Sequence, residues 1–216
     1  MYLSKKRYNM KNLFYILIFI QIFIFIPSCD SDIDGCIDPE ALNYNSEATN
    51  DDYSCEYLEI GSQYQGGIVF YIDSTGEHGL VASYNDLSGN YEWGCYGFNI
   101  SGANGVVLGT GLQNTLDIVA ADCFENIYAL TAATATFIYE GNGYNDWYLP
   151  SEDELVEMNN NIGFGSSLGN IAQLDSGFYW SSSQSFKNHA RCVVADWESA
   201  IQAKYSSLNV RPIRSF

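Results

Sequence analysis

Residue types that could perform catalysis are sparse in this chain. It has no HExxH zinc motif, no CxxC pair and no phosphate-binding P-loop. It also has no nucleophile elbow, which needs a strand-to-helix turn, because the glycine-rich run at 163–169 follows a predicted helix, as flexible connections do. His78 and His189 are isolated, and Cys192 lies in an apolar strand, where a buried thiol is more common than a nucleophile. The sequence therefore favours a non-catalytic protein, with an enzyme of unknown reaction as the alternative.

Oxygen-bearing side chains are concentrated between Cys36 and Cys55. Carboxylate and amide oxygens are the ligands that Ca²⁺ prefers, so calcium is the one cofactor that the sequence indicates. Asx turns, in which such side chains accept hydrogen bonds from nearby backbone amides, explain the same residues without a metal. Both interpretations concern Asp38, Asn43, Asn45, Asp51 and Asp52.

Charge is distributed very unevenly along the chain. Four of the nine Lys and Arg residues precede position 29, so the rest carries five basic and 26 acidic residues, a formal charge of −21. Nucleic acid is excluded as a partner, because binding it depends on neutralising phosphates with Lys and Arg. Direct contact with anionic lipid headgroups is equally disfavoured. All five basic residues lie in the last thirty positions, so some must face carboxylates within the fold.

The first 28 residues have the pattern of an export signal. Basic residues precede an apolar run at 13–26, which is short for a membrane span. Ile26, Ser28 and Cys29 match the bacterial lipobox, which implies cleavage after residue 28 and acylation of Cys29; a plain secretory signal or an uncleaved anchor is the alternative. The acidic tether at 29–34 resembles signals that send some lipoproteins to the outer face of the outer membrane. We therefore expect a lipid-anchored, surface-exposed protein.

The clearest helix signal follows Pro150. Proline disfavours helix in the residue before it, and Ser151 with Glu154 three positions later forms a capping box, so an extended segment turns into a helix here. A further helix is predicted at 126–140. The apolar residues predicted to face the core are Leu155, Met158 and Ile162 in the first of these helices, and Leu112, Leu116, Val119, Ala120 and Cys123 in another that starts at a capping box of Thr110 and Gln113.

The remaining regular segments have the alternation of strands. Residues 66–73 and 79–83 are joined by a short loop and predict a β-hairpin. Four more strands are predicted toward the C-terminus, at 178–182, 190–195, 200–205 and 209–216. Helices packed to one side of a mostly antiparallel sheet make an α+β domain. The prediction is therefore an α+β fold with two or three helices, preceded by a small disulfide module.

Several motifs in a fixed order carry a family resemblance. DWYLPSEDEL, FYWSSS and NVRPIRSF, with GGIVFYID, EHGLVAS, EWGCYG and GTGLQNTLDIV upstream, resemble the C-terminal domain of the Lcl collagen-like adhesins. That domain looks like a member of the C-type-lectin-like and sulfatase-modifying-factor superfamily. The resemblance covers residues 60–216 and implies a C-type-lectin-like domain in which the first and last strands pair, so that 66–73 would lie beside 209–216.

A second resemblance concerns residues 35–57. They are similar to a short disulfide repeat of exported bacterial surface proteins, GC-x-DP-x-A-x-NY ending in DDGSC, with Tyr53 where the repeat has glycine. The two resemblances together imply a bridge between Cys36 and Cys55 and another between Cys95 and Cys123, while Cys192 stays free. An exported protein occupies an oxidising compartment, in which such bridges persist.

The function expected from these observations is a non-catalytic cell-surface lipoprotein that binds a glycan or a protein ligand. The second cysteine of sulfatase-modifying enzymes and the EPN and WND sugar signatures of true C-type lectins are absent. A structural envelope protein is a further alternative. Aromatic and Arg side chains dominate binding interfaces, so the candidate contact residues are Tyr179, Lys187, Asn188, Arg191 and Trp197, whereas Trp180, between apolar neighbours, fits the core better.

An ion pair is expected to fix the C-terminal strand. The resemblance places Arg211 and Arg214 in that strand, and Glu152, Asp153 and Glu154 crowd one helical turn. An unpaired, partly buried guanidinium would be costly, and Arg prefers a carboxylate partner. We therefore predict that Arg211 is structural and pairs with Glu154; the alternative is that Arg211 or Arg214 contacts a ligand.

Overall fold

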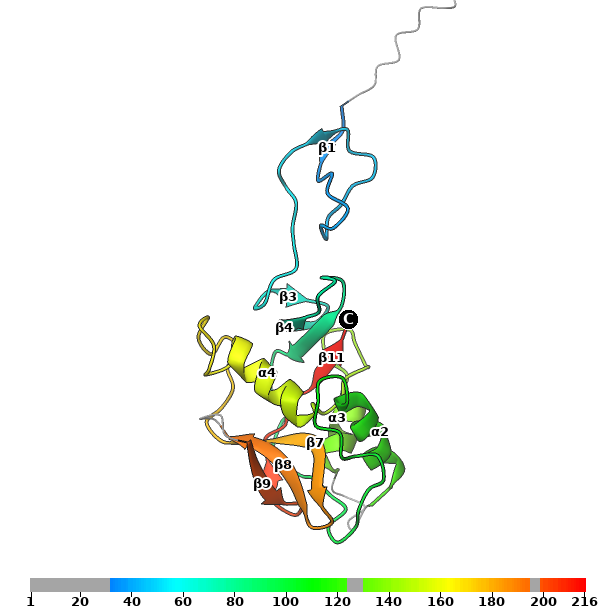
Figure 1. The fold of residues 1–216 in the computed structure, drawn as a ribbon, viewed down its shortest axis with the longest axis vertical. Coiled ribbons are helices and arrows are strands. Elements are labelled where there is room, and N and C mark those ends of the chain that lie inside the picture. Colours follow the sequence, from blue (N-terminus) through cyan, green and yellow to red (C-terminus); the bar gives the residue numbers. More distant parts are fainter. Residues whose placement is uncertain (1–31, 124–129, 195–198) are drawn as a thin grey trace, which may run out of the picture. The chain divides into compact units, whose positions relative to one another are not determined.

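The computed structural model describes residues 32–123, 130–194 and 199–216, and it divides into two compact units, Met1–Tyr57 and Leu58–Phe216 (Figure 1). The boundary between the units, after Tyr57, coincides with the predicted end of the disulfide module. The export signal, Cys29, Trp197 and the first part of the helix predicted at 126–140 lie outside the described residues.

The first unit is held by turns and one bridge. Its two short strands, β1 (Asp34–Gly35) and β2 (Asn50–Asp51), pair in parallel. The Cys36–Cys55 disulfide is present as expected, and Cys36 is buried in a unit that otherwise has little interior. Tyr53 has a left-handed backbone, with φ of 61°, which explains why glycine occupies this position in the repeat that the unit resembles.

The main sheet of the second unit has four antiparallel strands in the order β11-β5-β4-β3. The predicted hairpin is confirmed as β4 (Gly67–Ile72) and β5 (Gly79–Ser83). The last strand, β11 (Ile213–Ser215), pairs with β5 and not with β4, so the expected neighbour was wrong. The reason is that β3 (Gln63–Tyr64) already occupies the other edge of β4.

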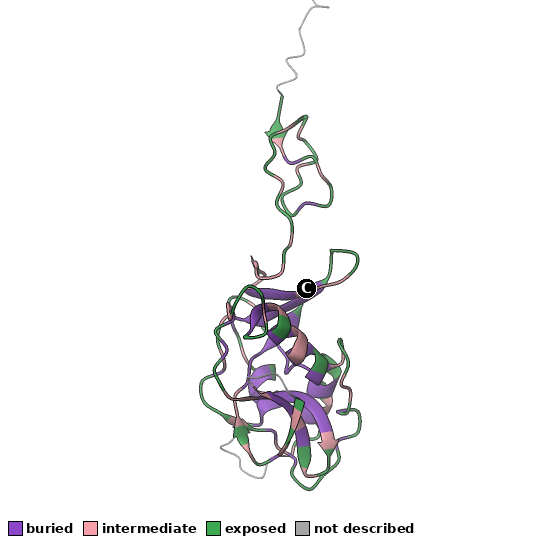
Figure 2. Ribbon diagram, turned by 60° about the vertical axis from the view of Figure 1, so that its left-hand side comes forward, coloured by how far each residue is buried: buried purple, intermediate pink, exposed green. Residues whose placement is uncertain are grey.

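A second antiparallel sheet follows the third helix. It consists of β7 (Phe178–Phe186), β8 (His189–Val194) and β9 (Ser199–Ala203). A short antiparallel pair, β6 (Tyr91–Glu92) with β10 (Ser207–Leu208), is connected to this sheet through an isolated bridge between Tyr179 and Asn209. Strand β5 is buried throughout, and β4 and β7 are buried over most of their length, which places the hydrophobic core around them (Figure 2).

Helix α4 (Glu152–Ile162) begins as predicted. The Ser151 hydroxyl accepts from the Glu154 amide and the Glu154 carboxylate accepts from the Ser151 amide, so the capping box is complete. Its buried side contributes Leu155, Met158 and Ile162 to the cluster that also contains residues of β4, β5 and β11. The local signals of the sequence therefore specify this element fully.

Helix α2 (Gly111–Ala120) differs from its prediction in two ways. Thr110 makes no side-chain cap hydrogen bond, and Leu112 and Leu116 are 45% and 38% exposed instead of facing the core. The buried side carries Asn114 and Thr115, whose polar atoms are satisfied: the Asn114 amide donates to Gly105 O, and Thr115 Oγ1 accepts from the Leu149 amide. These internal hydrogen bonds allow a polar side of the helix to face inward.

Helix α3 (Ala132–Phe137) is shorter than expected, within the part of 126–140 that the structure describes. The second unit is thus α+β, with mostly antiparallel sheets and three helices among the described residues. Its bridge joins Cys95 to Cys123, as expected, and Cys192 is a buried free thiol. Within the described ranges, none of the helices has the length and apolar character needed to cross a bilayer.

Candidate functional site

Two of the aromatic residues discussed for the contact surface belong to the core. Tyr179 is 4% exposed; its hydroxyl donates to Asp86 Oδ2 and accepts from the Asp175 amide, both at 2.7 Å. Burial and the hydrogen bond to Asp86 raise the pKa of Tyr179 far above its usual range. Trp180 is fully buried, as its apolar neighbours indicated, and Nε1 donates to Tyr91 O. Tyr179 is therefore removed from the contact residues.

The polar members of the predicted set lie on or beside the β7–β8 hairpin. Lys187 is exposed at its turn and Asn188 is half-buried. Arg191 is partly exposed on β8, and its Nη1 lies 3.0 Å from the Glu152 carboxylate. The structure therefore keeps Lys187 and Asn188 as surface candidates and assigns Arg191 an ion pair to the start of α4.

Exposed aromatic side chains gather around this turn. We call the surface formed by Tyr96, Phe98, Phe186, Lys187 and Tyr205 the hairpin patch. Phe98 and Phe186 are each 63% exposed, Tyr205 60% and Tyr96 39%. The Tyr96 and Tyr205 rings meet edge to face at 5.1 Å, and the Gly97 amide donates to Lys187 O at 3.0 Å. These contacts bring together three segments distant in sequence, which carry four exposed aromatic rings.

The buried side chain of Lys204 connects the segments that form the hairpin patch. It is fully buried, and Nζ donates to Phe98 O and to Gln184 Oε1, each at 2.8 Å, while the ammonium lies 4.3 Å from the Trp93 ring centroid. The Lys204 amide also donates to Asn188 O. Burial lowers the pKa of Lys204 to about 8. Lys204 is therefore a positioning residue that ties the Phe98 loop and the hairpin turn to β9.

The Cys95–Cys123 bridge fixes the loop that carries Tyr96 and Phe98. Cys95 itself has a left-handed backbone, with φ of 55°, and Gly97 follows at 88°. Such conformations turn the chain sharply, and glycine adopts them at little cost. The loop is therefore anchored at its start by a covalent bond and at its tip by Lys187 and Lys204.

The predicted ion pair between Arg211 and Glu154 was wrong. Arg211 is buried; Nε contacts Asp86 Oδ1 at 2.6 Å, and Nη1 donates to Ser83 O and Ala172 O. Glu154 instead accepts from the backbone amides of Ser151 and Gly109. The carboxylate is occupied by amides at the start of its own helix, and Asp86 follows β5, the strand that β11 joins.

Arg214 is structural as well. It forms a two-pronged contact with Asp146, at 2.6 and 2.8 Å, and its guanidinium lies over the Tyr144 ring at 4.0 Å. The hydrogen bond from Arg214 lowers the pKa of Asp146. Two of the three Arg residues beyond residue 28 thus fasten the C-terminal strand, and neither lies in the hairpin patch.

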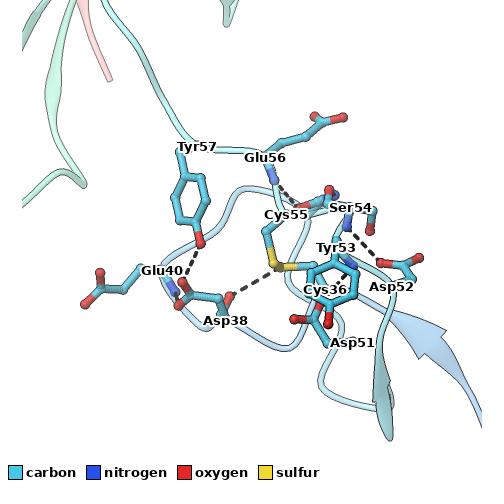
Figure 3. Close-up of a disulfide and its surroundings, with 11 residues drawn as sticks. Cys36, Asp38, Glu40, Asp51, Asp52, Tyr53, Ser54, Cys55, Glu56 and Tyr57 are labelled. Atoms are coloured by element: carbon cyan, nitrogen blue, oxygen red, sulfur yellow. Dashed lines mark hydrogen bonds between the residues drawn. A yellow bond between two sulfur atoms is a disulfide. The ribbon is translucent and has the colours of Figure 1, made fainter.

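The candidate calcium ligands act as turn acceptors (Figure 3). Asp38, Asp51 and Asp52 each accept from the amide two residues later, which is the geometry of an Asx turn. Asn45 does the same, and Asn43 bridges to Ser54 O and the Glu56 amide. The described residues contain no group of three or more His, Cys, Asp or Glu side chains suited to a metal. Asx turns thus account for Asp38, Asn45, Asp51 and Asp52, and Asn43 forms a cross-link between two strands of the loop backbone.

Cys192 is a poor nucleophile. It is buried in β8, and burial together with the Glu152 carboxylate raises the pKa of the thiol to about 12, whereas a reactive cysteine has a lowered pKa. Cys192 is therefore unsuited to act as a catalytic thiolate.

Two apolar hollows are both lined by Ser215, and neither is lined by a residue of the hairpin patch. One, of about 270 Å³, is lined by Leu112, Phe137, Asn145, Asp146, Trp147, Tyr148 and Ser215. The other, of about 480 Å³, is lined by residues of β4, β5, β11 and the loop before α2, including Tyr71, Asp73, His78, Leu108 and Phe216. Both are largely apolar.

Sequence reasoning missed Tyr96, Phe98, Phe186 and Tyr205. Each is a large aromatic residue beside a turn: Gly97 separates the first two, Lys187 and Asn188 follow Phe186, and Ser206 follows Tyr205. Aromatic residues next to turn-forming residues were the available signal. Their convergence depends on contacts between segments about 90 to 110 positions apart, which a linear pattern does not contain.

Comparison with known proteins gives no matching family model, and no curated protein matches. Among solved structures, a fimbrial protein from Bacteroides ovatus is similar, with a TM-score of 0.51 and 13% sequence identity over 79% of this chain. This chain corresponds to 50% of the length of that fimbrial chain. At this identity the similarity concerns the fold alone: an α+β arrangement that is shared with a fimbrial protein.

Proposed function

We propose that this protein is a surface-displayed binding module, anchored through an acylated Cys29, that contacts its ligand through the hairpin patch. The observation that carries the proposal is the exposure of Tyr96, Phe98, Phe186 and Tyr205. Scattered apolar residues on a surface are ordinary, whereas a contiguous exposed cluster marks an interaction site. The rings are also held in place, because Lys204 and the Cys95–Cys123 bridge fix the segments that carry them.

The ligand that fits the patch best is a glycan. Aromatic rings combine a large apolar face with few rotatable bonds, and Tyr adds a hydroxyl, so they bind the C–H face of a sugar ring at low entropic cost. The patch holds one basic side chain, Lys187, in a chain whose charge beyond residue 28 is −21. A sulfated glycan would be repelled, so the proposal is for a neutral glycan, and a protein ligand is the alternative.

The family expectation supports the same function. The Lcl-like motif order runs along the second unit, and helices with mostly antiparallel sheets are compatible with a C-type-lectin-like domain. The neighbour from Bacteroides ovatus is named a fimbrial protein, and fimbriae are surface structures. Both lines support display at the cell surface and leave the ligand to experiment.

A glycan array tests the proposal directly. The chain without its acyl group is applied with and without Ca²⁺, alongside Phe98→Ala and Phe186→Ala. We expect binding to neutral glycans that does not need Ca²⁺, because all five candidate calcium ligands already accept hydrogen bonds from backbone amides. Both substitutions should weaken it without loss of fold, since these side chains are mostly exposed. A silent array would refute the glycan and favour a protein ligand or a structural role.

A further inference from the structure

The apolar side of α2 and the end of α3 face outward and meet at a hollow. We call the surface formed by Leu108, Leu112, Leu116 and Phe137 the α2–α3 face; these side chains are 39%, 45%, 38% and 43% exposed. Leu112 and Leu116 lie one turn apart on α2 and therefore on one side of it. Leu112 and Phe137 form the rim of the 270 Å³ hollow, and buried Trp147 and Tyr148 also line it.

The α2–α3 face is almost free of charge. Residues 104–121 and 130–139 contain a single charged side chain, Asp117, whose carboxylate accepts from Gln113. The hollow is also lined by Asp146, whose charge is neutralised by its ion pair with Arg214. The chain beyond residue 28 nevertheless carries −21. A basic partner would find no cluster of carboxylates to pair with on this face. Two copies of this chain, which repel each other through most of their charge, approach at least cost where both are neutral.

The composition of the face also distinguishes between partners. Interfaces between transient partners are about as polar as the rest of the surface, whereas homodimer interfaces are more apolar and depleted of charge. Most soluble oligomers are homodimers in which the same patch of each copy meets its twofold mate. Leucine side chains beside a hollow of side-chain size suit such a self-complementary contact, because an apolar anchor entering a pocket is a typical hot spot.

We infer that the α2–α3 face is the interface of a homodimer, in which each copy packs its exposed leucines against the hollow of the other. Pairing through this face uses none of the residues of the hairpin patch. A dimer carries two hairpin patches, so it would bind a repetitive ligand with higher avidity than one copy.

Sedimentation velocity tests this inference on the mature chain with Cys29→Ser, so that no acyl chain drives association. We expect a reversible dimer that tightens as NaCl rises, because salt screens the repulsion between two acidic copies. Leu112→Gln and Leu116→Gln should each weaken it about tenfold or more, since both replace a central apolar contact. The matched control is Leu168→Gln, a leucine of similar exposure (52%) outside the face, which should leave the dimer unchanged.

Several results would overturn the inference. One is a monomer at every concentration and salt level. Another is a dimer that dissociates as salt rises, or one that both α2 variants leave intact. A third is a dimer that Leu168→Gln weakens as much as Leu116→Gln does. Thermal melts of the three variants should match wild type, because all three side chains are solvent-accessible.

Discussion

Arg211 fastens the C-terminal strand to the loop after β5. Its guanidinium is buried with Asp86 at 2.6 Å and two backbone carbonyls, so removing it leaves Asp86 without its counter-charge and the two carbonyls without this donor. We expect Arg211→Ala to lower the free energy of unfolding by about 3 to 5 kcal/mol. Urea titrations of Arg211→Ala, Asp86→Ala and the double variant should show non-additive losses. Additive losses would mean that the two side chains do not act as a pair.

Lys204 gives the protein a defined pH dependence. Its pKa is about 8 in the folded chain, below the 10.5 of an unperturbed lysine, so between these values the unfolded chain binds more protons. The free energy of unfolding should therefore rise with pH across that window, by at most about 1.4 kcal/mol per pH unit from this residue. Urea titrations at several pH values should show a flatter profile for Lys204→Met. Parallel profiles would contradict the assignment.

Residue-level features were predictable where sequence neighbours carry them. The capping box at Ser151 and Glu154 depends on residues three positions apart, and the bridge from Cys36 to Cys55 was implied by a spaced repeat. The partner of Arg211 was not predictable in this way. Asp86 lies 125 positions away, and it becomes the partner only because β11 joins β5.

At the scale of elements, the start of α4 is the best-specified junction. Ser151 is buried; its hydroxyl accepts from the Glu154 amide and donates to Val107 O. We expect Ser151→Ala to cost about 1 to 2 kcal/mol of stability, because it removes the buried side-chain cap of the helix. Thermal melts provide the measurement. Thr110→Ala is the control: Thr110 caps no helix amide, so it should cost less than half as much.

If both alanine variants lose the same stability, the capping box at Ser151 contributes nothing beyond an ordinary surface threonine, which would contradict the prediction.

Helix α2 illustrates why hydrophobic periodicity alone predicted the wrong side of a helix to be buried. Leu112 and Leu116 have the spacing of a core stripe, yet Asn114 and Thr115 face inward because buried backbone groups of Gly105 and Leu149 pair with them. Hydrophobic spacing predicts that one side is apolar, and only tertiary partners decide which side is buried.

At the scale of the whole molecule, the expected order is an acylated Cys29, an acidic tether, the disulfide unit and the binding domain. Cys29 lies outside the described residues, so its acylation is a prediction. Metabolic labelling with a tagged fatty acid should mark the wild-type chain and not Cys29→Ala, because the lipobox directs the lipid to that thiol. Labelling of both chains would place the lipid on another residue, and labelling of neither would contradict a lipid anchor.

The α+β class and most strands followed from local patterns, whereas the binding surface did not. The hairpin patch joins the loop after Trp93, the β7–β8 turn and the end of β9, which become neighbours only after both sheets form. Of the residues proposed from sequence, Lys187 belongs to it and Asn188 supports it through a backbone contact with Lys204. Exposure of an aromatic residue is a tertiary property, so composition alone could not separate Phe98 from Trp180.

The most direct test of the proposed function is isothermal titration calorimetry with the glycan that binds most strongly on the array. Wild type is compared with the triple variant Phe98→Ala, Phe186→Ala, Tyr205→Ala and with Leu168→Ala as the control outside the patch. We predict that the triple variant loses at least about 100-fold in affinity while its melting temperature is kept, because stacking on each ring contributes about 1 kcal/mol or more. Unchanged affinity in the triple variant, or equal loss in the control, would contradict binding through the hairpin patch.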